Sequence, residues 1–192
     1  EAGEVIRKST NQLTLILNNM LDLSDFESGL AKFTYKTFWA HGICEEAFNV
    51  AQERCPKNVR MRTECDVPLD MSFVTDGDKL VRVLIGLLVN ACINTNEGEI
   101  VIGCNLTENR GKTTFFVRDT GCGIPPEKAE EIFKRFVKLD SYKPGIGIGL
   151  TVARVIVNEM RASLKVDTSY TAGARFVLVH PLNLRKSDLI AK

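Results

Sequence analysis

In the second half of the chain, residues 113–118 lead into the stretch Asp119-Thr120-Gly121-Cys122-Gly123-Ile124-Pro125. Residues 113–118 are predicted to form one strand of a hairpin with residues 99–106, and the two glycines predict a tight turn at the end of that strand. An aspartate in a turn is common, so this turn alone could explain Asp119. The functional alternative is a carboxylate at the floor of a pocket. It would accept a hydrogen bond from the exocyclic amino group of adenine, with Gly121 and Gly123 leaving room for the base.

A second glycine segment reads Gly145-Ile146-Gly147-Ile148-Gly149-Leu150 and precedes a predicted helix over residues 150–161. Alternating glycines let a backbone approach a ligand closely, and the free N–H groups of a helix start favour an anion such as phosphate. A plain connecting loop is the alternative. The dinucleotide motif G-x-G-x-x-G is excluded, because its third glycine would fall at Leu150 or Val152.

Polar and small residues also share one face of the predicted helix over residues 76–93, where they recur every three or four positions at Lys79, Arg82, Gly86, Asn90 and Asn94. The opposite face is almost entirely valine, leucine and isoleucine and is predicted to enter the core. The side-chain oxygen of Asn90 is a hard ligand that suits Mg²⁺, although most asparagines on such a face are simply solvated.

The other predicted elements alternate in type. Strands are expected over 32–37, 59–65, 99–106, 164–168 and 175–179, and helices over 41–54 and 125–137, with a hairpin turn at 109–112. This order predicts an α+β fold with helices on one face of a sheet.

The first segment, residues 4–28, has no proline and carries Ile6, Leu13 and Met20 at intervals of seven. Other apolar residues accompany them at Ile16, Leu17 and Leu23. This spacing predicts a helix that packs against another helix, and Gly29 is well placed to end it. The helix either docks on its own domain or is one arm of a hairpin whose other arm is absent, and periodicity does not separate the two.

Composition excludes some classes. The 192 residues carry 25 basic and 24 acidic side chains, a net charge of +1, which argues against a nucleic-acid binder that relies on bulk positive charge. None of the six cysteines forms a C-x-x-C pair and there are two histidines, so buried reduced thiols are expected rather than a zinc site or a disulfide framework. No signal peptide is visible, and the most apolar stretch, 81–89, is too short to span a bilayer.

Taken together and in order, the motifs resemble a known family. The Asn90 helix is similar to an N-box, residues 119–125 to a first glycine box, Ile132-Phe133-Lys134-Arg135-Phe136 to an F-box, and residues 145–150 to a second glycine box. Residues 33–182 thus resemble the ATP-binding domain of sensor histidine kinases, in the Bergerat (GHKL) superfamily. Residues 13–29 resemble the second helix of the dimerisation and phosphotransfer hairpin of these kinases.

The resemblance implies a two-layer α/β sandwich with a mixed, mostly antiparallel sheet, preceded by one long helix. It divides the chain into the hairpin helix (1–29), the ATP-binding domain (30–182) and a tail or linker (183–192). ATP and Mg²⁺ would be the cofactors, with Asp119 on the adenine amino group, Asn90 on Mg²⁺ and residues 137–149 as a lid. The implied ATP-binding residues are Asn90, Asn94, Asp119, Gly121, Gly123, Ile124, Arg135, Lys138, Lys143, Gly145, Gly147, Gly149 and Leu150. Phe133 and Phe136 would pack in the core or, alternatively, against the lid.

The resemblance also implies a γ-phosphoryl transfer to a histidine outside this fragment, since neither His41 nor His180 has the expected context. Expected partners are a second copy through the helical hairpin and a response regulator or receiver domain, with no nucleic acid, no membrane contact by the fragment and a cytoplasmic location. Gly86, Ile93 and Ala174 depart from the family pattern and favour the alternative, a degenerate nucleotide-binding or dimerisation module without kinase activity. A hydrolysing ATPase of the gyrase type is disfavoured, because Gly86 stands where such enzymes carry a glutamate base.

Overall fold

The computed structural model describes residues 2–107, 111–140 and 147–182. The helices are α1 (Ala2–Glu27), α2 (Ala40–Gln52), α3 (Gly77–Asn94) and α4 (Gly149–Glu159), with two short 3₁₀ turns, η1 (Pro126–Lys128) and η2 (Glu131–Phe133). The strands are β1 (Lys36–Trp39), β2 (Val59–Asp66), β3 (Ser72–Thr75), β4 (Gly98–Leu106), β5 (Lys112–Asp119), β6 (Ser163–Val166) and β7 (Arg175–Pro181).

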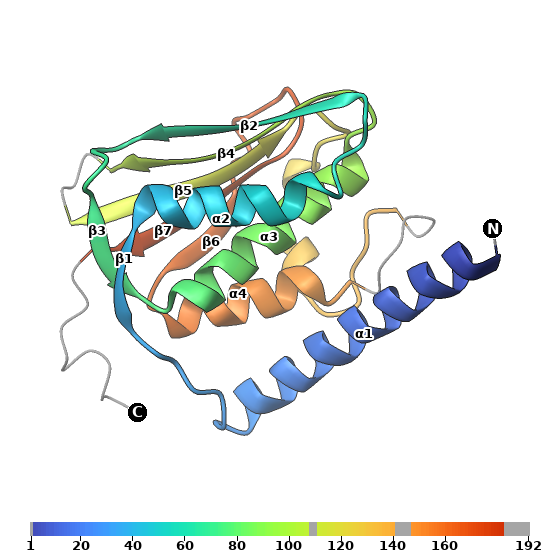
Figure 1. Ribbon diagram of the computed structural model, residues 1–192, viewed down its shortest axis with the longest axis horizontal. Helices are drawn as coiled ribbons and strands as arrows, with labels where there is room; N and C mark the ends of the chain where they lie inside the picture. Colours follow the sequence, from blue (N-terminus) through green and yellow to red (C-terminus); the bar gives the residue numbers. More distant parts are fainter. Residues whose placement is uncertain (1, 108–110, 141–146, 183–192) are drawn as a thin grey trace.

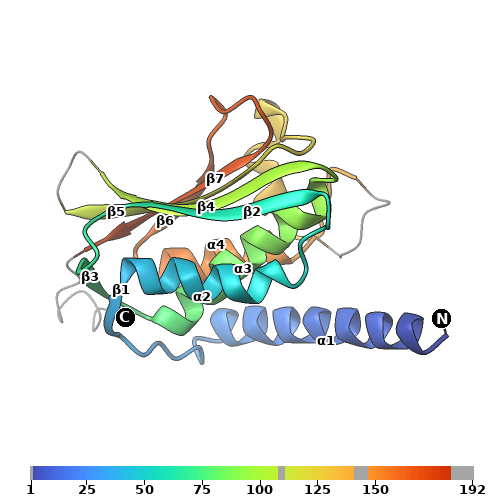
Figure 2. The same cartoon turned by 45° about the horizontal axis from the view of Figure 1, so that its top comes forward.

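Five strands form the main sheet in the order β2-β4-β5-β7-β6. β2 runs parallel to β4, and every other pair in this sheet is antiparallel. Helices α2, α3 and α4 cover one face of the sheet (Figures 1 and 2). The predicted α+β class and the two-layer arrangement are therefore confirmed.

The core lies between the sheet and these helices, and α3 shows why the sequence folds this way. The predicted apolar face of α3 is buried, including Leu84 and Leu88, which have no exposed surface. Asp76 caps the helix: its Oδ1 accepts from the Lys79 amide at 3.1 Å, while Oδ2 accepts from the Thr34 amide at 2.8 Å. The carboxylate thereby fixes both the start of α3 and the chain that enters β1.

Helix α1 lies below the layer of helices, on the side away from the sheet (Figure 2). Its last turns dock on the domain through Leu23, which is 8% exposed, and through Phe26. Leu13 and Leu17, by contrast, are 61% and 59% exposed. The helix is therefore attached at its C-terminal end and leaves an apolar stripe uncovered.

Two predictions about local structure are wrong. The helix expected over 125–137 is replaced by η1 and η2, because Lys134 is extended and Phe136 has φ +62°, neither of which an α-helix allows. The amide of Phe136 instead donates to the carbonyl of Gly147 at 2.9 Å, a bond between residues far apart in the sequence.

The strand expected over 32–37 lies at Lys36–Trp39, because it pairs with β3, a short strand that the sequence patterns did not predict. Residues 109 and 110 of the predicted hairpin turn and the predicted tail, 183–192, are outside the described residues. No helix in the described part of the chain is long and apolar enough to cross a bilayer.

Candidate functional site

The C-terminal end of α3 meets the glycine turn that follows β5. The amide of Cys122 donates to the carbonyl of Asn94 at 3.3 Å. A Cβ atom on Gly121 would lie 2.2 Å from that same carbonyl oxygen, so only glycine allows this close approach. The Asn94 side-chain amide donates to the Asn90 carbonyl at 2.7 Å and faces Asn90 Oδ1 at 3.3 Å. Three of the predicted site residues, Asn90, Asn94 and Gly121, are thus brought together.

Asp119 is the last residue of β5 and is 2% exposed. Its Oδ1 accepts hydrogen bonds from the amides of Gly121 at 2.9 Å and Ala174 at 3.3 Å. The Asp119 amide in turn donates to the Ala174 carbonyl at 2.9 Å. The hydrogen bond to the Gly121 amide is typical of an aspartate in a turn. The hydrogen bond from the Ala174 amide holds the carboxylate next to the start of β7. The structure therefore combines the turn with a buried, fixed acceptor.

A second glycine lets the neighbouring backbone approach the backbone of Asp119 closely. A Cβ atom on Gly173 would lie 2.1 Å from the Asp119 carbonyl oxygen. Gly123 has φ +73° and also faces Gly173, and Ile124 packs against the core. The two glycine-containing loops are consequently packed backbone to backbone around Asp119.

Sequence reasoning missed one polar group at this place. The Thr95 hydroxyl is buried, has no hydrogen-bond partner among the described residues, and lies 2.9 Å from where a Gly121 Cβ would stand. A buried hydroxyl without a partner costs free energy unless a ligand or water satisfies it. Its only signal in the sequence is its position directly after Asn94.

The second glycine segment ends at the start of α4. Gly147 has φ +73°, and a Cβ atom there would lie 2.6 Å from the Val137 carbonyl oxygen. Within the described part of the chain, no side chain caps the first amides of α4, at Gly149 and Leu150. Because α3 and α4 run side by side in opposite directions, the start of α4 lies at the same end of the domain as the end of α3 (Figure 1). Such a helix start suits an anionic group.

The basic residues that the sequence predicts for the site have different surroundings. Arg135 forms an ion pair with Glu27 of α1. Lys138 is half-buried, and Lys143 and Gly145 lie outside the described residues. Only part of the predicted lid is thus described.

The two aromatic residues of the F-box have different positions. Phe133 is 5% exposed, meets Phe176 edge-on at 6.3 Å between ring centroids, and has the Arg154 guanidinium 4.3 Å from its ring centroid. Phe136 is 67% exposed. Core packing is confirmed for Phe133 and wrong for Phe136, because the positive φ of Phe136 breaks the helical spacing on which it rested.

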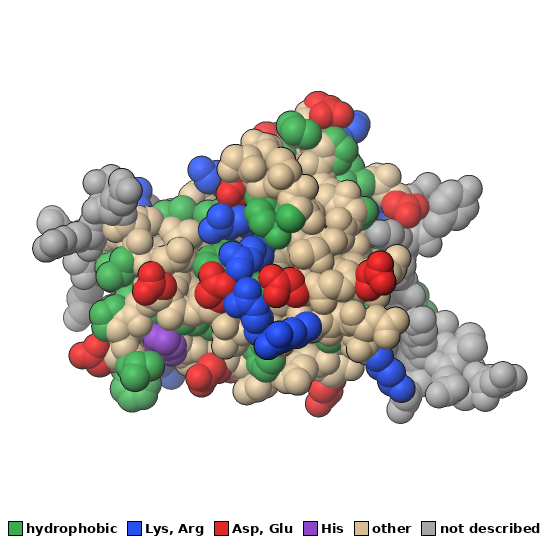
Figure 3. Space-filling model, turned by 90° about the horizontal axis from the view of Figure 1, so that it is seen from above, with side chains coloured by type: hydrophobic (Ala, Val, Ile, Leu, Met, Phe, Trp, Pro, Cys, Tyr) green, Lys and Arg blue, Asp and Glu red, His purple; other side chains and the backbone are tan. Residues whose placement is uncertain are grey.

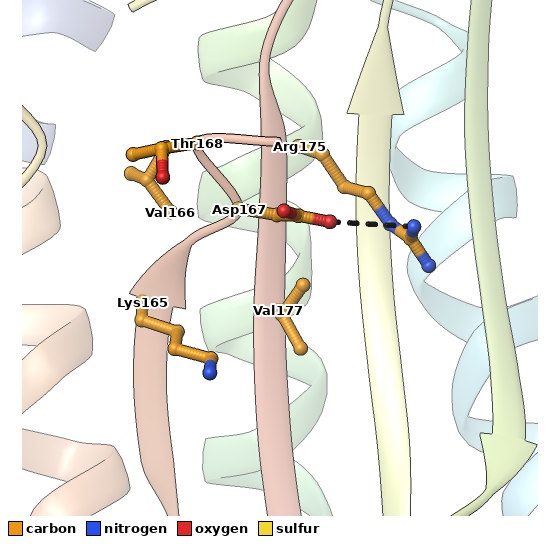
Figure 4. A pocket seen from close by; sticks show the side chains of 6 residues that line it. All are labelled: Lys165, Val166, Asp167, Thr168, Arg175 and Val177. Atoms are coloured by element: carbon orange, nitrogen blue, oxygen red, sulfur yellow. Dashed lines mark hydrogen bonds and ion pairs between the residues drawn. The ribbon is translucent and has the colours of Figure 1, made fainter. Parts of the chain in front are cut away.

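The outer face of the sheet carries intermingled charges of both signs (Figure 3). Arg62 pairs with Glu64 and Glu99, and Arg118 pairs with Glu64 at 2.8 Å. A shallow hollow of about 340 Å³ lies beside them at the β6–β7 turn, where Arg175 pairs with Asp167 at 3.4 Å (Figure 4). On this face, Arg62, Arg118 and Arg175 are thus each paired with an acidic side chain.

Comparison with known proteins agrees with the motifs. Residues 75–184 match the family described as histidine kinase-, DNA gyrase B- and HSP90-like ATPase. The chain is 28% identical over 188 residues to the autoinducer 2 sensor kinase/phosphatase LuxQ of Vibrio vulnificus, covering 93% of this chain and 22% of that protein. It is 35% identical over 196 residues to the sensor protein SrrB of Staphylococcus aureus, covering 94% of this chain and 31% of that protein. The chain therefore spans less than a third of either relative.

Two solved structures share the fold. Full-length ShkA in complex with AMPPNP has a TM-score of 0.81 at 20% identity, covering 95% of this chain and 38% of ShkA. The catalytic domain of the histidine kinase ThkA has a TM-score of 0.69 at 25% identity, covering 78% of this chain and 97% of that domain. The match to ShkA covers 95% of this chain and therefore includes α1, whereas the match to the ThkA domain covers 78%.

Proposed function

The chain belongs to the histidine kinase-, DNA gyrase B- and HSP90-like ATPase family, and we propose that it is the ATP-binding catalytic region of a sensor histidine kinase. The observation that carries the proposal is the buried Asp119 carboxylate, held by the amides of Gly121 and Ala174 beside the end of α3. A fixed acceptor there selects a base with an amino donor, which adenine has and guanine lacks at the same position. Gly121, Gly123 and Ile124 would line the base, and the Thr95 hydroxyl would gain a partner directly or through water.

Asn90 is our candidate ligand for Mg²⁺. Its Oδ1 is positioned by the Asn94 side-chain amide at 3.3 Å, which fits a neutral oxygen ligand presented from a rigid helix. Asn90 would thus hold Mg²⁺, whose positive charge would offset the negative charge of the phosphates. Asn94, one turn further along, would lie close to the phosphates.

The phosphates would be held by the start of α4. The amides of Gly147, Gly149 and Leu150 are suited to donate to phosphate oxygens, with Gly145, Lys138, Lys143 and Arg135 as further candidates. An anion site built from amides and a helix start explains how a chain of net charge +1 could bind a polyphosphate.

In the whole protein, the γ-phosphoryl group would pass to a histidine outside residues 1–192. His180 is fully buried, and the His41 ring nitrogen Nε2 lies 3.0 Å from the Val67 carbonyl oxygen, so neither histidine is presented as an acceptor. Gly86 offers no general base, so hydrolysis of ATP is not expected to compete.

Helix α1 would serve dimerisation. Leu13, Leu17 and Leu21 are exposed by 59–62%, as expected for a helix whose hairpin partner and second copy are to cover it. We assign residues 1–29 to this hairpin, 30–182 to the ATP-binding domain and 183–192 to a tail or linker. A response regulator or receiver domain is the expected downstream partner, and the cytoplasm the expected location.

The proposal is tested by titrating the chain with a fluorescent ATP analogue, with and without Mg²⁺, and by competing it off with ATP, ADP and GTP. We expect saturable binding below 1 mM that ATP and ADP reverse and GTP does not. Binding that GTP reverses equally well would contradict the assigned role of Asp119. The absence of saturable binding would favour a degenerate module instead.

Phosphotransfer is tested separately. The chain is extended upstream by the hairpin of its full-length protein and incubated with γ-labelled ATP. We expect an acid-labile phosphohistidine that is absent from the shorter chain. Nucleotide binding without any phosphohistidine in the extended protein would contradict the kinase assignment.

A further inference from the structure

Three cysteines from three separate elements converge beneath α2. Cys44 lies on α2, Cys65 on β2 and Cys104 on β4. Their sulfur atoms all lie within 4.8 Å of one another. Cys44 and Cys104 have no exposed surface, whereas Cys65 is half-buried, so the cluster reaches solvent at one edge.

The fold explains why these residues meet although their spacing in the sequence predicts nothing. Cys65 and Cys104 are direct partners in the parallel register of β2 and β4. Cys44 is on the buried face of α2, which lies across the same strands (Figure 1). A search for closely spaced cysteine pairs cannot detect such a site, because each element contributes one thiol.

The three cysteines would bind a metal ion as thiolates, which are the form of cysteine that ligates metal ions.

The geometry is close to that of a metal centre. With metal–sulfur bonds of about 2.3 Å, two thiolates in a tetrahedral zinc site are separated by about 3.8 Å. The sulfur atoms here need to move by about 1 Å or less to reach that spacing. Packing as small apolar residues does not require that all three sulfur atoms meet.

We propose that Cys44, Cys65 and Cys104 form a binding site for a thiophilic d¹⁰ metal ion, Zn²⁺ or Cu⁺. Soft thiolate ligands select these ions over Mg²⁺ and Ca²⁺. Each cysteine that ligates the ion releases its thiol proton to solvent. Because the ion binds the folded arrangement, it should stabilise the domain.

The site is separate from the nucleotide site. Cys104 stands four residues along β4 from Ile100, the partner of Asp119 in the sheet, which corresponds to about 13 Å. The metal ion should therefore raise the melting temperature without changing nucleotide affinity. This inference does not rest on the proposed function, and either can fail without the other.

The test uses the whole chain, stripped of metal and kept reduced with a phosphine, and two separate titrations. One titration adds Zn²⁺ in competition with a chromophoric chelator, and the other adds Cu⁺ under anaerobic conditions with a Cu⁺-specific chelator. We expect one ion per chain and a higher melting temperature in at least one titration. The titration that succeeds identifies the ion.

The variants are Cys65→Ser and Cys122→Ser. Cys65 is the most accessible ligand, so its replacement is the least disruptive, and circular dichroism verifies the fold. Loss of a ligand should weaken binding by more than the roughly 10–100-fold typical of an outer-shell partner. Cys122 is exposed and outside the cluster, so Cys122→Ser should bind like the parent.

A second measurement does not depend on variants. Bound metal should slow alkylation of Cys65 but not of Cys122, as measured by mass spectrometry of the intact parent chain. The proposal is overturned if neither ion binds, if Cys65→Ser binds as tightly as the parent, or if metal protects Cys122 and Cys65 equally.

Discussion

The two ends of the main sheet are built on different principles. At the end near Asp119, glycines at 121, 123 and 173 let backbone segments touch, and backbone amides hold the carboxylate of Asp119. At the opposite end, polarisable and titratable groups are enclosed: the thiols of Cys44 and Cys104 and the ring of His180 have no exposed surface. The same sheet and the same three helices support both arrangements.

This comparison indicates which side chains can be exchanged without loss of the fold. At the first end, fixed backbone atoms define the shape, so adding even one carbon atom to a glycine should be damaging, whereas exchanging a polar atom should leave the fold intact. At the second end, side chains fill the space and their protonation contributes to stability. Each prediction below tests one part of this contrast.

The largest effect is expected from Gly121→Ala. The added Cβ would lie 2.2 Å from the Asn94 carbonyl oxygen and 2.8 Å from its carbon, and both are backbone atoms of a packed helix end. We expect a loss of about 3 kcal/mol in the free energy of unfolding, which corresponds to a melting temperature lower by roughly 6–12 °C.

Gly86→Ala is the matched control. A Cβ atom on Gly86 meets nothing within 4 Å, and the residue is exposed within α3. Alanine is better than glycine inside a helix, so this variant should gain about 0.5–1 kcal/mol. Equal melting temperatures for the two alanine variants would show that backbone contact at Gly121 does not define the site.

Asp119→Asn should act on binding rather than folding. Asparagine keeps an oxygen that can accept from the Gly121 and Ala174 amides, but it also places a donor where the carboxylate has an acceptor. We expect ATP affinity to fall roughly 30- to 100-fold, or about 2–3 kcal/mol. The melting temperature without nucleotide should stay nearly unchanged, as followed by scanning calorimetry.

Asp70→Asn provides the control, because Asp70 is an exposed loop residue between β2 and β3. It should bind ATP like the parent. A large fall in the melting temperature of Asp119→Asn, with little change in affinity, would instead assign Asp119 mainly to the turn.

At the enclosed end, His180 should make stability depend on pH. Burial lowers the pKa of His180 to about 4, while Nδ1 donates to the Pro181 carbonyl at 2.7 Å and Nε2 accepts from the Thr75 hydroxyl at 3.0 Å. Between pH 4 and the ordinary histidine pKa of about 6.5, the unfolded chain binds more protons than the folded one. The stabilisation is therefore complete above about pH 6.5 and is lost as the pH falls towards 4.

We expect a loss of about 2 kcal/mol between pH 6.5 and 4.5 that is attributable to this residue. Urea unfolding of the parent and of His180→Gln over this range measures it, since carboxylates contribute equally to both. Parallel pH profiles for the two proteins would show that His180 does not titrate in this range on unfolding.

Much of the fold could be predicted from the sequence, and the exceptions have physical reasons. The helical period of α3 reflects burial on one face of the helix, and this pattern can be read from neighbouring residues in the sequence. The helix expected over 125–137 failed because Phe136 takes a positive φ to bond with Gly147, and no nearby residue signals that bond. β3 was missed because it is defined by its pairing with β1, a distant segment of the chain, and no local pattern signals that pairing.

The candidate site likewise has a part that the sequence predicts and a part that it does not. The contacts among Asn94, Asp119 and Gly121 were foreseeable because each motif stands where an element ends. The Thr95 hydroxyl and the three-cysteine cluster were not, because they depend on which elements pack together. Arg135 was expected near the phosphates, and the structure pairs it with Glu27 of α1, a residue 108 positions away.

This ion pair provides the smallest predicted effect. Both partners are about half exposed, so Glu27→Gln should change the free energy of unfolding by less than about 1 kcal/mol. It would release the Arg135 guanidinium for the phosphates, so ATP affinity should rise about two- to threefold, as measured by the same nucleotide titration. Asp22→Asn breaks a different ion pair of α1, with Arg82, and leaves Arg135 paired, so it should cost as little stability without the gain in affinity. If both variants raise the affinity equally, the cause is the loosening of α1 rather than the charge of Arg135, and the nucleotide end of the domain then depends on α1 as well as on its own glycines.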